Sequence, residues 1–202
     1  MLLSYAPNSR AVRVAWVMEE LGIDYEVEKF TLGDPNLRTP DFRAKNPNGR
    51  VPTLMDGDVT LHESGAIVQY LLGRYGNGDL VPEPSSDAYP VYLQWFHYTE
   101  GMIMPQMNNL VVETILLPPE KASETHAKRA KKLLTQILGG VEAHMSDGRE
   151  YIAGTFSGAD FMIGHAVVMA GQMGADMSNY PNLQGYAARI EGRNAFQAAE
   201  AK

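Results

Sequence analysis

Hydrophobic residues follow two different periods in the first third of the chain. Residues 2–5 form a short apolar run, which is typical of a β-strand. Apolar residues then recur at i, i+3, i+4 and i+7 over residues 14–21, which predicts a helix that ends at Gly22. Residues 25–32 alternate between apolar and charged positions and predict a second strand. The chain therefore begins with a β-α-β unit, which favours two parallel strands.

A hairpin and a helix follow this unit. Two short β-prone runs, residues 51–54 and 59–61, flank an Asp-Gly-Asp turn, which is a strong hairpin signal. Helical spacing then covers residues 67–72 and stops at Gly73. The predicted order is βαβ followed by ββα, and we expect this α/β domain to span residues 1–77.

The rest of the chain has helical patterns only. Residues 76–87 are rich in Gly, Pro, Ser and Asp and have no hydrophobic period, so we expect a linker over residues 78–88. Helical stretches follow, and Ser157 and Asp160 have capping-box spacing before the apolar run 161–170. That run is apolar on every face, which predicts a buried central helix. We expect an all-α bundle over residues 89–202.

Composition excludes several classes of function. The net charge of -7 repels phosphate backbones, so nucleic acid is not an expected partner, and the basic run 128–132 is expected on a solvated helix face. The chain has no cysteine, which excludes disulfides and thiolate metal sites, and its five histidines lack metal-ligand spacing. No apolar stretch approaches the ~20 residues of a membrane span, and the N-terminus does not resemble a signal peptide. We therefore expect a cytoplasmic protein without a membrane partner.

Three segments, in this order, resemble motifs of the cytosolic glutathione S-transferase family. They are NPNGRVPTL at residues 46–54, LHESGAI at residues 61–67 and SGAD at residues 157–160. The first is similar to the family's segment leading into a cis-proline, the second to a ligand-binding helix start, and the third to a buried capping box. The resemblance covers essentially the whole chain. It implies a thioredoxin-like N-terminal domain that binds glutathione as co-substrate, an all-α C-terminal bundle, and a homodimer.

The resemblance also implies which residues hold the peptide part of glutathione. A cis Pro52 would turn the Val51 N–H and C=O toward the ligand, which would pair with them as a short extra strand; a plain trans turn is the alternative. Glu63 and Ser64 begin a helix, where N–H groups and the dipole suit the γ-glutamyl carboxylate. Capping of that helix is a second role for both residues, compatible with the first.

Two arginines stand nearest to these motifs. In plant-type and theta-type members, basic or amide side chains at the positions of Arg38 and Arg50 meet the glycine carboxylate of glutathione. Arginine pairs carboxylates in a bidentate manner, so the chemistry fits. The alternative for Arg50 is an ordinary surface charge.

The group that would activate the thiol lies within residues 4–10, and there the chain departs from the usual family patterns. Ala6 stands where theta-like members carry Ser, and Ser4 stands where mammalian-type members carry Tyr. Asn8 and Ser9 remain as candidate donors at the start of the first helix. Ser9 as a simple N-cap is one alternative, and Arg10 acting through its charge is another.

The second substrate pocket implied by the family would be lined by Ala6, Pro7, Tyr98, Met102 and Met104, although ordinary helix-core packing is the alternative for the methionines. The reaction implied is conjugation of the glutathione thiolate to a small hydrophobic electrophile, as in detoxification. Two alternatives stay open: glutathione-dependent reduction of peroxides or disulfides, and a non-catalytic glutathione-binding scaffold.

Overall fold

The computed structural model describes residues 1–202, and the contacts within it divide the chain into two units. The first unit comprises Met1–Asp79 together with Gly192–Lys202, and the second comprises Leu80–Glu191. No helix in the structure is both long enough and apolar enough to cross a membrane.

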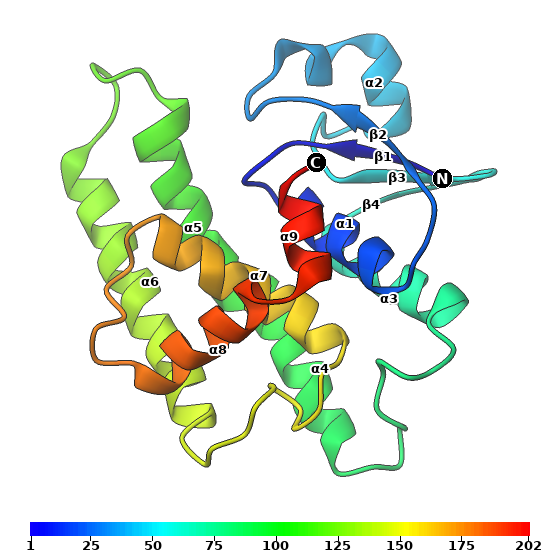
Figure 1. Ribbon diagram of the computed structural model, residues 1–202. Helices are drawn as coiled ribbons and strands as arrows, with labels where there is room; N and C mark the ends of the chain where they lie inside the picture. Colours follow the sequence, from blue (N-terminus) through cyan, green and yellow to red (C-terminus); the bar gives the residue numbers. More distant parts are fainter. The chain divides into compact units, whose positions relative to one another are not determined.

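A four-stranded mixed sheet forms the centre of the first unit (Figure 1). The strands are β1 (Leu2–Tyr5), β2 (Glu26–Lys29), β3 (Thr53–Asp56) and β4 (Val59–His62), in the spatial order β2-β1-β3-β4. β1 and β2 are parallel and are joined by α1 (Ala11–Glu20), whereas β3 runs antiparallel to β1 and β4. After the hairpin comes α3 (Ser64–Tyr75), so the predicted fold class is confirmed. Between β2 and β3 lie η1 (Pro35–Arg38) and α2 (Pro40–Lys45).

Helix α1 is buried on all sides over residues 11–18 because a second helix covers it. That helix is α9 (Asn194–Glu200), whose Phe196 ring meets the Trp16 ring edge-on at 4.9 Å between centroids. The Tyr5 hydroxyl donates to the Ala199 carbonyl at 2.8 Å, and Arg193 forms an ion pair with Glu20. Residues 192–202 therefore pack with the α/β unit, whereas the sequence pattern suggested that they belong to the helical domain.

The second unit is entirely helical. Its elements are α4 (Ala88–Tyr98), the π-helical turn η2 (Thr99–Ile103), α5 (Met104–Val111), the π-helical turn η3 (Val112–Leu116), α6 (Glu124–His144), α7 (Gly158–Gln172) and α8 (Pro181–Glu191). Residues 158–170 of α7 are all buried, as predicted for the central helix. The capping box is present: Asp160 accepts hydrogen bonds from the N–H and hydroxyl of Ser157, and also from the Ile152 N–H and the Tyr186 hydroxyl.

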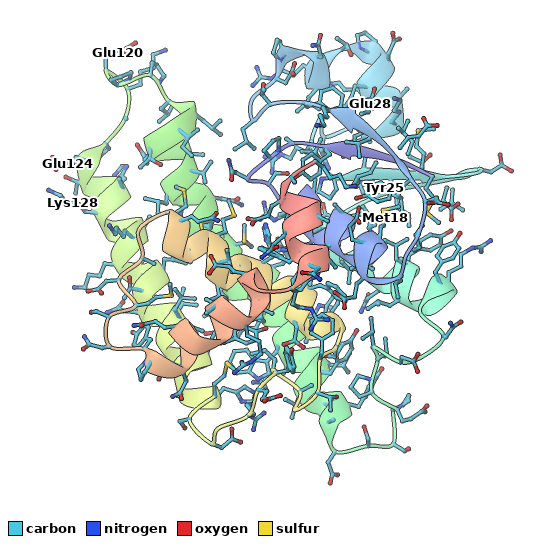
Figure 2. The ribbon with its side chains drawn as sticks, in the orientation of Figure 1. Met18, Tyr25, Glu28, Glu120, Glu124 and Lys128 are labelled. Carbon is cyan, nitrogen blue, oxygen red and sulfur yellow. The ribbon has the colours of Figure 1, made fainter.

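The basic run at residues 128–132 lies on α6. Figure 2 shows Glu124 and Lys128 projecting from this helix, and Lys128 Nζ lies 2.6 Å from Glu124 Oε1. Both side chains are largely exposed. This part of α6 is therefore a solvated helix face, as the sequence predicts.

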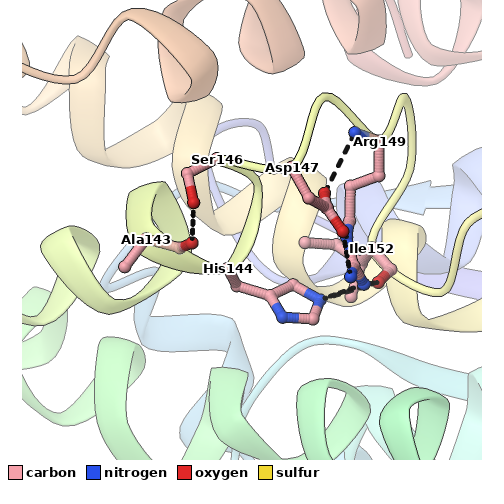
Figure 3. A network of polar contacts seen from close by, with 6 residues as sticks. All are labelled: Ala143, His144, Ser146, Asp147, Arg149 and Ile152. Carbon is pink, nitrogen blue, oxygen red and sulfur yellow. Dashed lines mark hydrogen bonds and ion pairs between the residues drawn. The ribbon is translucent and has the colours of Figure 1, made fainter.

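A polar network braces the loop between α6 and α7 (Figure 3). Arg149 binds both carboxylate oxygens of Asp147, and its Nη1 lies 2.8 Å from His144 Nε2. Arg149 Nη1 also donates to the Ile152 carbonyl at 3.1 Å. Burial lowers the pKa of His144, and the neighbouring Arg149 cation adds to this effect. His144 Nε2 also lies 2.9 Å from the Ile152 carbonyl oxygen, so the imidazole tautomer decides whether this nitrogen donates to that carbonyl or accepts from the guanidinium.

Candidate functional site

The strand register brings three chain segments to one end of the sheet, called here the cis-proline end. Thr53 of β3 lies opposite His62 of β4, so the residues just before Thr53 and just after His62 leave the hairpin together. Ser4 of β1 also pairs with Thr53, so β1 ends at the same place. The loop at residues 46–52, the start of α3 and the β1–α1 turn thus converge there.

The loop at residues 46–52 is held by a buried asparagine. The Val51–Pro52 peptide bond is cis, as the family resemblance implied. Asn46 donates from Nδ2 to the Arg50 carbonyl at 2.8 Å and to Thr53 Oγ1 at 3.1 Å. The paired residues of β3 begin at Thr53, so the sheet does not use the N–H and C=O of Val51. A short peptide can pair with such a backbone edge.

Gly49 is required in this loop for a steric reason. Its φ is +61°, a conformation that L side chains rarely adopt, and a Cβ there would lie 2.5 Å from the Leu37 carbonyl oxygen. Neither Gly49 nor Asn46 was predicted as a site residue. The NPNG segment contains both, but their roles depend on contacts with Leu37 and Thr53 that the pattern does not reveal.

The first turn of α3 offers unpaired backbone donors. The first helical hydrogen bond runs from the Ile67 N–H to the Glu63 carbonyl, so the N–H groups of Ser64, Gly65 and Ala66 have no partner within the helix. No side chain caps this end, so the capping role expected for Glu63 and Ser64 is not seen. Backbone donors at a helix N-terminus, together with the dipole, form a site for an anion such as a carboxylate.

Glu63 and Ser64 differ sharply in their surroundings. Glu63 is exposed and has φ 74°, ψ 110°, an unfavourable conformation for a residue other than glycine. Ser64 is 2% exposed, and its Oγ accepts a hydrogen bond from Arg13 Nη1 at 3.2 Å. Arg13 was not predicted as a site residue, because an arginine within an apolar helical stripe gives no signal of its partner.

The β1–α1 turn contains both candidate thiol activators. The buried Ser9 hydroxyl donates to the Ala6 carbonyl at 2.6 Å and accepts from the Ala11 N–H at 3.1 Å. Ser9 therefore binds the first N–H of α1, but the N-cap residue of this helix is Arg10, so Ser9 is not the N-cap that the simpler interpretation expected. Asn8 is exposed, with φ 55°. Tyr5 is fully buried, and burial raises its pKa to about 12, so it points into the fold.

Comparisons with known proteins agree with this arrangement. A family model described as "Glutathione S-transferase, N-terminal domain" matches residues 3–80. Glutathione S-transferase 3 of Zea mays is 36% identical over 155 residues, which cover 74% of this chain and 67% of that protein. The chain belongs to the glutathione S-transferase family.

Two further members of the glutathione S-transferase family match over more of the chain. Glutathione S-transferase 4 of Zea mays is 31% identical over 192 residues, covering 88% of this chain and 82% of that protein. A sphingomonad glutathione S-transferase, solved in complex with glutathione, is 26% identical with a TM-score of 0.83, and the match covers 100% of this chain and 98% of that one.

The remaining residues that family resemblance suggested have varied positions. Arg38 ends η1 and Arg50 lies in the cis-proline loop, and both side chains are exposed. In the first unit, Ala6 is fully buried and Pro7 is exposed. Of Ala6 and Pro7, only Pro7 therefore exposes its side chain to solvent.

The candidate pocket residues of the helical unit also differ from one another. Met104 is 1% exposed and belongs to the core of the helical unit, in agreement with the packing alternative. Tyr98 is half-buried and donates its hydroxyl to the Ile137 carbonyl at 3.1 Å, and burial raises its pKa. Met102 is 45% exposed, so among Met104, Tyr98 and Met102 it is the residue with an exposed apolar side chain.

Proposed function

We propose that this chain binds glutathione at the cis-proline end and transfers its thiolate to a small hydrophobic electrophile. In this proposal the γ-glutamyl carboxylate occupies the first turn of α3, held by the Ser64 hydroxyl and backbone N–H. Glu63 lies near the ammonium group of the ligand. The cysteinyl backbone pairs with Val51 before the cis Pro52.

The glycine carboxylate of glutathione is assigned to two cations. Arg38 and Arg50 are exposed, so each guanidinium is accessible to a carboxylate, which arginine can bind in a bidentate manner. The main support for the whole arrangement is the strand register, because it brings a backbone edge and an open helix N-terminus to the same end of one sheet.

Calorimetry with Ser64→Ala tests the placement of the γ-glutamyl end. Loss of a hydrogen bond to a charged group should weaken glutathione binding by ~1–3 kcal/mol. Ser146→Ala is a matched control, since Ser146 makes only a local bond to the Ala143 carbonyl in the helical unit. An unchanged dissociation constant for Ser64→Ala would remove this assignment.

Thiol activation is assigned to the β1–α1 turn. Asn8 has an exposed amide, and we propose that it donates directly to the thiolate sulfur. The Ser9 hydroxyl hydrogen is used by Ala6, so Ser9 contributes by fixing the turn and the start of α1. A thiol with an ordinary pKa of ~8.5 is mostly protonated at neutral pH, so this stabilisation determines the reactive fraction.

Ultraviolet absorbance of the bound thiolate, followed against pH, tests both residues. Asn8→Ala should raise the apparent pKa of bound glutathione and lower turnover. Ser9→Ala should also raise that pKa, and in addition should lower stability by ~1 kcal/mol through the lost hydrogen bonds to Ala6 and Ala11. If neither variant shifts the titration, the backbone N–H groups of the turn are sufficient and the catalytic assignment fails.

The second substrate is assigned to the β1–α1 turn, where Pro7 exposes an apolar side chain. Catalysis would come from proximity of the two substrates and from stabilisation of the thiolate. An assay panel with a halonitrobenzene, a hydroperoxide and hydroxyethyl disulfide separates conjugation from reduction. Activity toward the last two alone would replace the transferase proposal with a glutathione-dependent reductase. Binding without any turnover would indicate a scaffold.

We also propose that the protein acts as a homodimer in the cytoplasm, as the family resemblance implies. Sedimentation velocity should give a species of about twice the chain mass of 22.3 kDa at micromolar concentration. A monomer under those conditions would contradict this part of the proposal.

A further inference from the structure

Arg13 is a fully buried cation at the edge of the candidate site. It lies on α1 between two buried valines, and its side chain has no exposed surface. Arginine is rarely buried to this extent, because removing a charge from water is costly. Its Nη1 donates to Ser64 Oγ at 3.2 Å, and Ser64 is itself 2% exposed. The contact joins α1 to the first residue of α3.

This contact determines whether the Ser64 hydroxyl is a donor or an acceptor toward each of its neighbours. A guanidinium has N–H donors and no acceptor, so the Ser64 oxygen must be the acceptor toward Arg13. The hydroxyl hydrogen therefore points away from Arg13. It does not cap α3, because no side-chain cap is present at that end of the helix. The hydrogen is thus available to an acceptor placed at the first turn of α3.

The positive charge of Arg13 strengthens this donor. Hydrogen bonds in a chain polarise one another, so a hydroxyl that accepts from a cation becomes a better donor. The α3 dipole acts in the same direction, because it also favours negative charge at this end. Both effects select an anionic acceptor, such as a carboxylate, over a neutral one.

We propose that Arg13 is a positioning residue for glutathione. It holds the Ser64 hydroxyl as an obligate donor toward the γ-glutamyl carboxylate. Because the Arg13 side chain has no exposed surface, it acts through Ser64 and not by touching the ligand. The inference rests on the proposed function, since it requires glutathione at the start of α3.

A double-mutant cycle tests the inference by calorimetry with glutathione. The proteins are wild type, Arg13→Met, Ser64→Ala and the double variant. Each single change should weaken binding by about tenfold, or ~1.4 kcal/mol. The double variant should bind no more weakly than Ser64→Ala, because Arg13 acts only through that hydroxyl. Arg13→Lys keeps a cationic donor and should recover part of the affinity.

Steady-state kinetics give a readout that a purely structural role would not move. Arg13→Met should raise KM for glutathione while leaving kcat at saturating glutathione close to that of wild type. Arg193→Met is the matched control. It removes an arginine from the same unit, at the ion pair with Glu20 near the other end of α1. It should lower stability and leave the dissociation constant unchanged.

The possible outcomes separate the inference from the proposed function. If wild type gives no binding heat, the proposed function fails, and this inference fails with it. If wild type binds but Arg13→Met weakens binding as much in the Ser64→Ala background as alone, only the role of Arg13 is wrong. An unchanged affinity in Arg13→Met also refutes it. If Arg13→Met does not fold, Arg13→Gln, which keeps a neutral amide donor, takes its place in the cycle.

Discussion

Replacing Asp160 with alanine should destabilise the helical unit more than any other single change at a capping position. The carboxylate is fully buried and accepts four hydrogen bonds, at 2.9 and 3.2 Å from Ser157, 3.1 Å from the Ile152 N–H and 2.8 Å from the Tyr186 hydroxyl. Burial raises its pKa to about 6, so the group is still mostly ionised at pH 7. It joins the start of α7 to the preceding loop and to α8.

The magnitude follows from the donors left without an acceptor. In Asp160→Ala the two N–H groups and the Tyr186 hydroxyl remain buried, whereas the Ser157 hydroxyl can rotate. At ~1.5 kcal/mol for each lost bond to a charged acceptor, the cost is about 4–5 kcal/mol. That is a large share of the ~5–15 kcal/mol by which folded domains are stable. For a chain of this size it corresponds to a fall in melting temperature of ~10–15 °C.

Urea denaturation followed by far-ultraviolet circular dichroism measures this cost. Tyr186→Phe removes one of the donors and should cost ~1.5–3 kcal/mol. Asp176→Ala is the matched control, because Asp176 is exposed and its carboxylate hydrogen-bonds only to the nearby Ser178; it should cost less than ~1 kcal/mol. A loss below ~2 kcal/mol in Asp160→Ala would refute the reasoning, since it would mean that the buried donors find other partners.

Two more predictions concern the brace of the α6–α7 loop and the attachment of α9. Because burial and Arg149 lower the pKa of His144, the unfolded chain binds the proton more tightly than the folded one. The free energy of unfolding should therefore fall as the pH drops below about 6.5. The fall in the urea midpoint between pH 7 and pH 5 should be smaller in His144→Gln than in wild type. Phe196→Ala removes a fully buried ring from Trp16 and should cost ~3–5 kcal/mol. Hydrogen exchange should then quicken across α9, and protection equal to wild type would contradict the packing argument.

Local patterns were sufficient for much of the fold. The turn at Gly57 and its flanking β-prone runs specify the β3–β4 hairpin. The spacing of Ser157 and Asp160 specifies the start of α7. Both signals depend only on neighbours within a few residues. The cis Pro52 needed the family resemblance, since an isolated Val-Pro pair favours the trans isomer.

Other features depend on residues far apart in the chain, which periodicity cannot pair. The short apolar face of α9 carries no sign of which core it covers, so its contact with Trp16 was not anticipated. Likewise, Arg13 in an apolar stripe gives no indication that it meets Ser64, which lies 51 positions later. Ser9 as the N-cap of α1 was among the alternatives, but the N-cap is Arg10, and the Ser9 hydroxyl instead bonds to Ala6 and Ala11 within the turn.

The packing of α9 on α1 has a consequence for biosynthesis. The ribosome makes residues 1–79 first, then the whole of Leu80–Glu191, and only afterwards the segment that covers Trp16. Along the chain, the helical unit thus lies between the two segments that form the α/β unit. The α/β unit stays incomplete on one side of α1 until residues 192–202 have been made, because Phe196 packs on Trp16 there. The helical unit has no such dependence on later residues, so it can be the first to complete its core.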